Sequence, residues 1–393
     1  HHKSQYLITN ALVEESSKTE LITFCSRSRP GFPIVLKPKE RLVELYRKDE
    51  NDERMRLELP SDPESASFIK YTQDTLYEYN AFISKQCICL DLTDDHLKQT
   101  AEALKRNTVK DPVCFYSTQL RRIFSRGSMQ QGGRFYGGWW QQLPERFRAH
   151  ITINGEKTVE VDFSSIAYTI LYAEKGYYIE AGSDPYDIGL PNWQGKDDQR
   201  RKVIKKFMNA LINDYKGNYS LSKSLEAEIG MSNSDLKAQV LKRHSAIADD
   251  LEAGKGLWTQ FKDSQIAFSV MESLTKQDIP VLPIHDSFIV RCEDYKRLFT
   301  EMFIAASIYC NFLLQTDANP PRRLKDFGLK GVDYEFDKNT LYLTEVIGES
   351  FNHNTRMNQF YLSWLKQQPK TEETEDKTGN TKRTGLIFGN AKS

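Results

Sequence analysis

The chain has 393 residues, of which 39% are hydrophobic, and its 54 Lys and Arg residues balance its 54 Asp and Glu residues. This length supports two or three domains or one large multi-lobed domain with a real core. The neutral total argues against a protein that binds nucleic acid through bulk positive charge alone, although a local basic groove stays compatible with it.

The sequence contains no apolar run of the roughly 18 residues that a membrane span needs, and no secretory signal opens the chain. Its six cysteines are scattered, and only Cys87 and Cys89 stand close together. Because no second pair lies at the spacing of a zinc site, we interpret the cysteines as reduced core thiols. We therefore expect a cytoplasmic protein without a membrane partner.

Residues 3–130 are predicted to form a mostly helical N-terminal lobe. Apolar residues recur at helical spacing over residues 65–84 and 94–106, which predicts two helices. The charged, proline-containing segment 51–64 predicts a loop. At the other end of the chain, residues 351–393 finish in a polar, charged stretch that we expect to be a loose tail.

A strand-and-turn pattern ends at Asp162. The dipeptide Asn154-Gly155 separates two short apolar runs, which is a strong signal for a β-hairpin. The second strand of this hairpin ends at Asp162, and a serine cap then opens a helix near Ile166. Taken alone, an aspartate at such a junction is more often a helix cap or a surface residue.

A second apolar pattern brings a His-Asp pair to a tight turn. Two strand-like runs flank His285 and Asp286. Because Asp162 and Asp286 each follow a strand, two neighbouring strands could bring both carboxylates together, and the intervening residues leave room for a helical insertion. Such a pair can hold two Mg²⁺ ions that clamp the attacking and leaving oxygens of a phosphoryl transfer.

An amphipathic basic helix is predicted between the two aspartates. Its apolar stripe is made by Val203, Ile204, Phe207 and Leu211. Arg201, Lys205 and Asn209 follow each other at intervals of four residues and project from a different face. Two cations one turn apart can grip a triphosphate, and a solvated basic face is the alternative interpretation.

These segments resemble the palm and fingers of A-family DNA polymerases and of their relatives, the single-subunit RNA polymerases of phages and mitochondria. Five elements carry the resemblance, in the family's order: Gly133-Arg134, Asp162-Phe163-Ser164, Arg201 with Lys205, the helix around Gln265, and His285-Asp286-Ser287. They cover about residues 130–292. Each element is short, so it is their order that makes the resemblance specific.

The resemblance implies an α/β (α+β) fold: a right-hand-like palm with an antiparallel sheet, reduced helical fingers and a helical, thumb-like N-terminal lobe. The expected domains are an N-terminal thumb-like or accessory lobe (3–130), a first palm segment with the first metal motif (131–182), a fingers-like helical insertion (183–256), a second palm segment with the second metal motif (257–350) and a C-terminal segment (351–393).

The resemblance also implies a role for each site residue. Asp162 and Asp286, with the backbone carbonyl of Phe163, would bind two Mg²⁺ ions, which Mn²⁺ could replace. The expected catalytic residues are Asp162, Asp286, Lys205 and His285. The expected nucleotide-binding residues are Arg200, Arg201, Lys205, Asn209, Phe163 and Ala167. The expected nucleic-acid contacts are Arg134, Gln265 and His285.

Two positions depart from the family. Asn213 stands where the fingers helix of the family carries a tyrosine. Ala167 stands where the DNA polymerases carry a bulky glutamate that blocks a ribose 2′-hydroxyl. Because a methyl group cannot exclude that hydroxyl, the sequence predicts weak sugar discrimination or a preference for ribonucleotides.

The function predicted from the sequence is a nucleic-acid polymerase of the nucleotidyltransferase class, similar to a primase or a small RNA polymerase. Its expected partners are a DNA or RNA primer–template and nucleoside triphosphates, and a protein partner cannot be read from the sequence. The alternatives are an A-family-like DNA polymerase, a template-independent nucleotidyltransferase, a two-metal phosphodiesterase, and an inactive nucleic-acid-binding protein with a polymerase fold.

Overall fold

The computed structural model describes residues 41–92, 117–163, 165–177, 179, 184–214 and 219–310, together with four short strands at 22–25, 316–319, 374–375 and 381–382. The chain divides into two compact units. Unit 1 comprises residues 1–164, 260–305 and 316–334, and unit 2 comprises 165–259, 306–315 and 335–393. None of the described helices combines the length and apolar character that crossing a membrane requires.

An antiparallel sheet of seven described strands forms the centre of unit 1, in the order β1-β4-β7-β8-β10-β9, with β11 also paired to β8. The strands are β1 (Ile22–Cys25), β4 (Ile88–Leu92), β7 (Ile151–Ile153), β8 (Glu156–Phe163), β9 (Leu282–Ile284), β10 (Ser287–Arg291) and β11 (Thr316–Asn319). The predicted hairpin is confirmed, because Asn154 and Gly155 adopt the positive φ angles that join β7 to β8. The mixed α/β class with an antiparallel sheet is confirmed as well.

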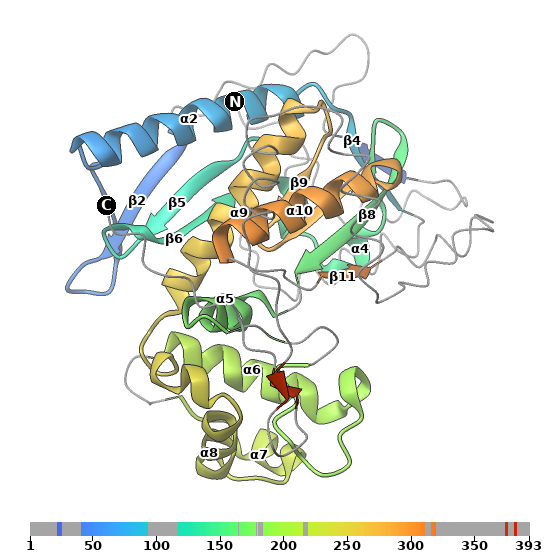
Figure 1. Ribbon diagram of the computed structural model, residues 1–393. Helices are drawn as coiled ribbons and strands as arrows, with labels where there is room; N and C mark the ends of the chain where they lie inside the picture. The colour runs from blue at the N-terminus through green and yellow to red at the C-terminus, as the bar shows by residue number, and fades with distance from the viewer. Residues whose placement is uncertain are drawn as a thin grey trace. The chain divides into compact units, whose positions relative to one another are not determined.

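A second sheet in unit 1 has the order β3-β2-β5-β6. Its strands are β2 (Val43–Lys48), β3 (Arg54–Leu57), β5 (Arg121–Ser125) and β6 (Ser128–Tyr136). One face carries a small core of Val43, Leu45 and Phe124, on which Phe68 and Phe261 pack. Figure 1 shows helix α2 (Pro63–Ile83), which supplies Phe68, running along this sheet.

The prediction of a mostly helical N-terminal lobe is wrong for the described residues. Residues 41–92 and 117–130 contain one helix, α2, together with the strands β2, β3, β4 and β5 and the start of β6. Strand β3 lies inside the segment that was predicted to be a loop. The pairing of β2 with β5 joins residues far apart in the chain, so no local pattern indicates it. The helix predicted over 94–106 lies outside the described residues.

The interpretation of all six cysteines as reduced thiols is also wrong. Cys89 is part of a disulfide, whereas Cys87 and Cys292 are free. Strand pairing, which spacing in the sequence does not show, decides which cysteines approach each other. In the ladder of β1 and β4, Cys25 stands opposite Cys89.

The remaining helical elements of unit 1 are η1 (Trp139–Gln142), α4 (Glu145–Arg148), η4 (Cys292–Asp294), most of α9 (Gly256–Lys276) and most of α10 (Tyr295–Cys310). Both Trp139 and Trp140 are fully buried. The indole nitrogen of Trp140 donates to the carbonyl of Pro283 at 3.1 Å, so this tryptophan fixes β9 from the side. These two rings therefore belong to the core.

We expect Gly138→Ala to destabilise unit 1 by about 3 kcal/mol. A Cβ at residue 138 would lie 2.3 Å from Cζ2 of the buried Trp140 ring, and its φ of −73° adds no strain of its own. Chemical denaturation measures the loss. In the control Gly155→Ala nothing lies within 4 Å of the new Cβ, so only the positive φ costs about 1 kcal/mol. Equal losses in both variants would contradict the steric account.

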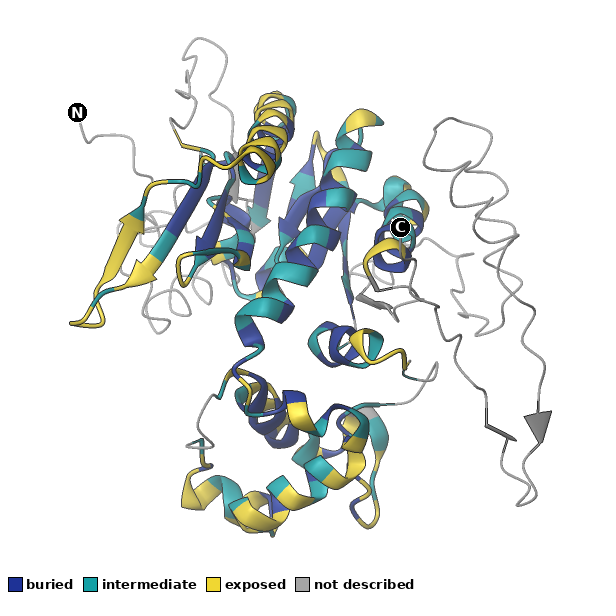
Figure 2. Cartoon of the chain, turned by 60° about the vertical axis from the view of Figure 1, so that its left-hand side comes forward, coloured by how far each residue is buried: buried dark blue, intermediate teal, exposed yellow. Residues whose placement is uncertain are grey.

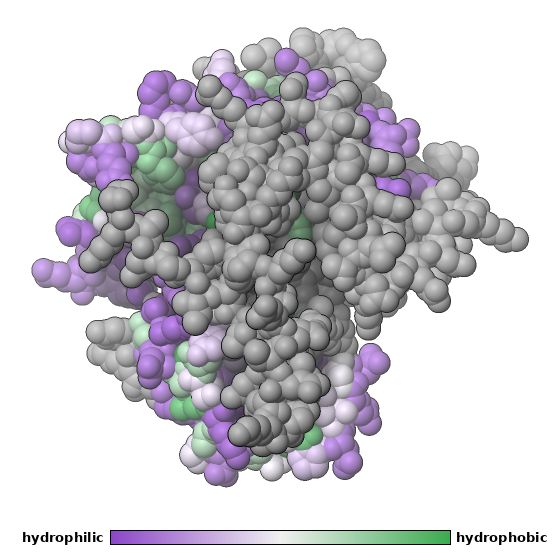
Figure 3. Space-filling view, in the orientation of Figure 1, coloured by the Kyte–Doolittle hydropathy of each residue, from purple (hydrophilic) through white to green (hydrophobic). Residues whose placement is uncertain are grey.

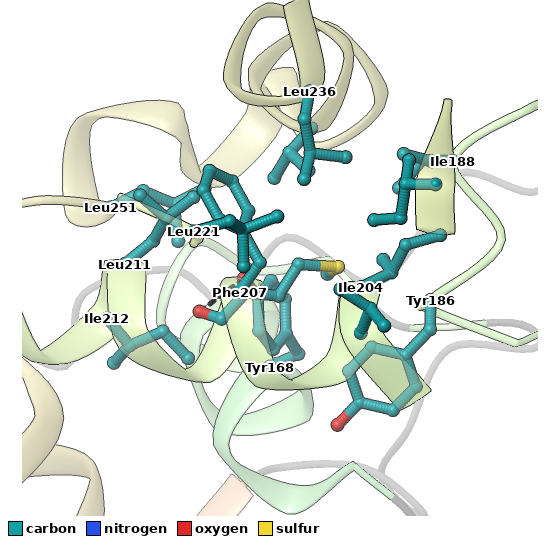
Figure 4. Close-up of a cluster of buried hydrophobic side chains, with 14 of the residues drawn as sticks. Tyr168, Tyr186, Ile188, Ile204, Phe207, Leu211, Ile212, Leu221, Leu236 and Leu251 are labelled. Carbon is teal, nitrogen blue, oxygen red and sulfur yellow. Dashed lines mark hydrogen bonds between the residues drawn. The ribbon is translucent and has the colours of Figure 1, made fainter. Parts of the chain in front are cut away.

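Unit 2 is built from helices around its own apolar core. The helices are α5 (Ile166–Glu174), η2 (Gly195–Asp197), α6 (Gln199–Asn213), α7 (Lys223–Ile229), α8 (Asn233–Arg243) and η3 (Ser245–Asp250). The predicted apolar stripe of the basic helix is confirmed: in Figure 4, Phe207 and Leu211 of α6 lie among the core side chains with Leu221 and Leu251. Asp198 caps this helix by accepting a hydrogen bond from the backbone N–H of Arg200.

Residues 374–375 and 381–382 form the paired strands β12 (Thr374–Glu375) and β13 (Thr381–Lys382).

His244 joins three segments of unit 2. Its Nε2 lies 2.9 Å from the carbonyl oxygen of Pro185, and its Nδ1 lies 2.9 Å from the hydroxyl of Tyr172. Because a carbonyl only accepts, Nε2 carries the proton of the neutral ring and Tyr172 donates to Nδ1. Burial lowers the pKa of His244 to about 4, and the neighbouring Arg243 acts in the same direction.

We expect unit 2 to lose up to about 3 kcal/mol of stability as the pH falls from 6.5 to 4. The unfolded chain takes up a proton on His244 near its ordinary pKa of 6.5, whereas the folded chain resists it down to about 4. The stabilisation is therefore complete above the unfolded pKa and disappears towards the folded one. Urea unfolding at several pH values measures it, and His244→Gln should flatten the dependence. An unchanged dependence in that variant would contradict the assignment.

Candidate functional site

The two predicted metal ligands lie on neighbouring strands of unit 1. Asp162 is on β8, and its register partner on β10 is Ser287, the residue that follows Asp286. The backbone N–H of Phe163 donates to the carbonyl oxygen of Asp286 at 3.3 Å. Both aspartates are half-buried. The structure thus brings together the two carboxylate-bearing residues that the sequence pattern singled out.

His285 and Asp286 form the two-residue turn between β9 and β10. His285 has a φ of 61°, which is uncommon for a residue other than glycine. Its ring packs edge-on against Tyr136, with the ring centres 5.5 Å apart. Burial, Arg134 and Arg148 together lower the pKa of His285 to about 4, against the opposing effect of Asp286. At neutral pH this imidazole is therefore uncharged.

An ion pair supports this turn. Arg148 donates two hydrogen bonds to the carboxylate of Glu160, at 2.8 and 2.7 Å, and the hydroxyl of Ser287 donates to the same carboxylate at 2.7 Å. Both charged side chains are largely buried, at 14% and 16% exposure. Neither residue stands out in the sequence, although Glu160 shares a face of β8 with Asp162 because side chains two positions apart on a strand point the same way.

Arg134 is held by a buried acid. Its guanidinium group forms a two-bond ion pair with Asp263 of α9, with Nε at 3.1 Å from Oδ1 and Nη2 in close contact with Oδ2. Burial raises the pKa of Asp263 to about 7, Arg134 opposes this shift, and Asp286 adds to it. Sequence reasoning missed Asp263, which is 129 residues away from its partner. Burial lowers the pKa of Arg134, whereas the charges of Asp263 and Asp286 raise it, and the net shift is upward.

Gln265 is positioned by a fully buried arginine. Arg122 donates to the amide oxygen of Gln265, to the hydroxyl of Ser264 at 2.9 Å and to the carbonyl of Gly133 at 2.8 Å. Four aromatic rings surround its guanidinium group: Phe68, Phe124, Phe135 and Phe268. The half-buried Gln265 therefore has its amide oxygen engaged and its amide nitrogen as the remaining donor.

A glycine is required at position 133 because β6 lies very close to its neighbours there. A Cβ there would lie 2.8 Å from the ring of Phe124 and 3.0 Å from the hydroxyl of Ser264, and its φ is +76°. The Gly-Arg element found in the sequence therefore has a packing reason in this chain: it lets β6 approach α9 so that Arg134 reaches Asp263.

The predicted cations of unit 2 lie along α6. Arg201 donates to both oxygens of Asp184, at 2.6 and 3.1 Å, and its guanidinium carbon lies 5.0 Å from the ring centre of Tyr186. Lys205 is exposed, and its Nζ lies 5.7 Å from the same ring. Lys205 is thus the cation of this pair that reaches solvent, whereas an aspartate engages Arg201.

Arg200 and Asn209 take different places on the same helix. Arg200 donates to Asp198 and to the carbonyls of Pro191 and Asn192, so it closes the start of the helix. Arg200 also holds the pKa of Asp198 well below its usual range. Asn209 is exposed, and its carbonyl accepts from the side chain of Asn213 at 2.8 Å.

The two remaining predicted site residues, Phe163 and Ala167, and the substituted position Asn213 all make packing contacts. Phe163 is buried and packs edge-on against Phe288. Ala167, in the first turn of α5, packs against the core of unit 2. The side chain of Asn213 lies so close to Gly256 that a Cβ there would be 1.8 Å from its amide oxygen, so Asn213 serves the contact between α6 and the start of α9.

The donor set at the strand ends suits Mg²⁺. In the described ranges no group of three or more His, Cys, Asp or Glu side chains is placed to hold a metal ion, so the candidate ligands are the carboxylates of Asp162 and Asp286. Mg²⁺ is typically bound by one or two carboxylates, with waters and substrate phosphates completing its shell. A third aspartate, Asp317 of β11, is the other register partner of Asp162.

Comparison with known proteins gives a distant likeness. No family model and no curated protein matches the chain. Among solved structures, the chain is similar to the POL domain of Pol1 from M. smegmatis, solved in complex with DNA primer-template and dNTP, with 13% identical residues and a TM-score of 0.38. The match covers 57% of this chain and 50% of that one, so the chain spans half the length of that structure.

Proposed function

We propose that this protein is a nucleotidyltransferase that adds nucleotides to a 3′-hydroxyl of a nucleic acid, with Asp162 and Asp286 as the ligands of two Mg²⁺ ions. One observation carries the proposal: Asp162 is paired across the ladder with the residue that follows Asp286. Two carboxylates on adjacent strands supply the hard oxygen ligands that a two-metal site needs.

The bound ions would lower the pKa of the attacking hydroxyl and stabilise the leaving pyrophosphate. The chain's own groups hold the reactants. The neutral imidazole of His285 lies beside the primer terminus, Arg134 and the amide nitrogen of Gln265 bind the primer–template backbone, and the carbonyl of Phe163 adds a metal ligand. The proposed product is templated, with ribonucleotides accepted because Ala167 cannot block a 2′-hydroxyl.

Lys205 is the proposed triphosphate contact. We expect Lys205→Ala to lower kcat/KM for the nucleotide about a hundredfold, because a point charge on the phosphates is lost. Lys206→Ala is the matched control, since Lys206 is the next residue of α6 and is also exposed; it should keep its activity within about twofold. Steady-state incorporation kinetics separate the two variants, and equal losses would contradict a specific role for Lys205.

The test of the proposed function is incorporation of each dNTP and each NTP with and without defined templates, with products sized on a gel. Template-directed extension with NTPs supports the proposal. Extension with dNTPs alone would support an A-family-like DNA polymerase, and extension without a template would support a template-independent transferase. Cleavage of the nucleic acid without any triphosphate would support a phosphodiesterase instead.

A further inference from the structure

The sheet of β3, β2, β5 and β6 has a second face, opposite to the core of Val43, Leu45 and Phe124. Because side chains alternate along a strand, Tyr46 lies on this face. The register places Tyr46 opposite Arg56 and Arg121 opposite Tyr136. We define the arginine–tyrosine strip by five side chains on this face: Tyr46, Arg54, Arg56, Arg121 and Tyr136.

Side-chain contacts connect three members of the strip, Arg54, Tyr46 and Arg121, the last through Glu44. The guanidinium carbon of Arg54 lies 3.9 Å from the ring centre of Tyr46. The hydroxyl of Tyr46 donates to Glu44, and Glu44 also pairs with Arg121 at 3.2 Å.

The strip continues to the candidate site. Arg121 is the register partner of Tyr136, whose ring packs on His285. The strip therefore leads from the outer strand of the sheet to the turn that holds Asp286, entirely within unit 1.

The strip has an excess of positive charge that is accessible. Arg54 and Arg56 are exposed, the side chain of Arg121 is 42% exposed, and neither Arg54 nor Arg56 forms an ion pair with a described residue. The acid that Tyr46 and Arg121 contact, Glu44, is only 6% exposed. Figure 2 shows that β3 and the end of β2 are exposed, and Figure 3 shows hydrophilic side chains at the end of their hairpin.

We propose that the arginine–tyrosine strip binds a single strand of nucleic acid and directs it to the Asp286 turn; this inference rests on the proposed function. Guanidinium groups bind phosphates through paired hydrogen bonds. Tyr136, 37% exposed beside His285, offers a surface on which a base stacks, as in other proteins that bind single strands. Four strands span about 14 Å, which accommodates a few phosphates.

The experiment is equilibrium binding of a labelled single-stranded DNA of about 20 nucleotides to the full chain, without triphosphate or metal. We expect Arg54→Ala with Arg56→Ala to weaken binding about tenfold at low salt. The slope of log K against log salt should fall by about 1.4 in magnitude, since two phosphate contacts are lost. Tyr136→Ala should weaken binding about tenfold, whereas Tyr136→Phe keeps the ring and the affinity.

The matched control is Arg47→Ala. Arg47 is exposed and lies on the same strand pair, but its register partner is Met55 and it points to the opposite face. We expect its affinity to stay within about twofold of the parent. The inference is overturned if the Arg54/Arg56 variant also binds within twofold, or if Arg47→Ala loses as much affinity.

The assay separates the two proposals because it requires no synthesis. A protein that binds through the strip but incorporates no nucleotide under any condition would refute the proposed function and support the strip. A protein that synthesises nucleic acid, yet keeps the parent's affinity for the single strand after the Arg54/Arg56 change, would refute only the proposal for the strip.

Discussion

Asp286→Asn is expected to lower nucleotide incorporation by about a thousandfold or more. The amide has the shape of the carboxylate but no charge, so it is a far poorer ligand for Mg²⁺. The fold should persist, because the contact to Phe163 uses the backbone carbonyl of Asp286. Single-turnover extension of a labelled primer measures the loss, and binding of the primer–template should stay close to that of the parent.

The control for this change is Asp278→Asn. Asp278 lies in the turn before β9 and is exposed, but it is not part of the proposed site. It should retain full activity. Incorporation by the Asp286 variant at the parent's rate would remove this residue from the metal site and, with it, the proposed mechanism.

Glu160→Leu is expected to lower the free energy of unfolding by about 3 kcal/mol. The change leaves the guanidinium of Arg148 largely buried without its carboxylate, and the hydroxyl of Ser287 also loses its acceptor. The double change Arg148→Met with Glu160→Leu should cost less than Glu160→Leu alone, because no unpaired charge remains. Urea unfolding of the three proteins gives the comparison. A double variant that loses as much stability as Glu160→Leu alone, or more, would show that burial of an unpaired charge is not the cause.

The segments of the site that are continuous in the chain could be predicted from the sequence. Asn154-Gly155 specifies the hairpin that ends at Asp162, two apolar runs specify the turn at Asp286, and the apolar stripe of α6 specifies the helix that carries Lys205. Each of these signals is local, because a turn dipeptide or a helical period is written in neighbouring residues.

The side-chain partners could not be predicted in this way. Arg134 finds Asp263 at a separation of 129 residues, and Arg122 finds Gln265 at 143. The strands β2 and β5 are short and rich in charge, and they gain their stability from each other rather than from their own sequence. The helical pattern likewise predicts Arg201 as a nucleotide-binding cation but does not show that Asp184, 17 residues earlier in the chain, accepts its hydrogen bonds.

The order of the two units along the chain has a consequence for engineering. The run 165–259 of unit 2 starts directly after β8 and returns to unit 1 within α9, and it contains the apolar core drawn in Figure 4. A module interposed in this manner can be exchanged or resized while the host sheet keeps its ladder. Lys205, the proposed nucleotide contact, lies inside this run, whereas Asp162 and Asp286 lie outside it. Replacement of the run would therefore change the proposed nucleotide contact and leave the pair of acidic side chains in place.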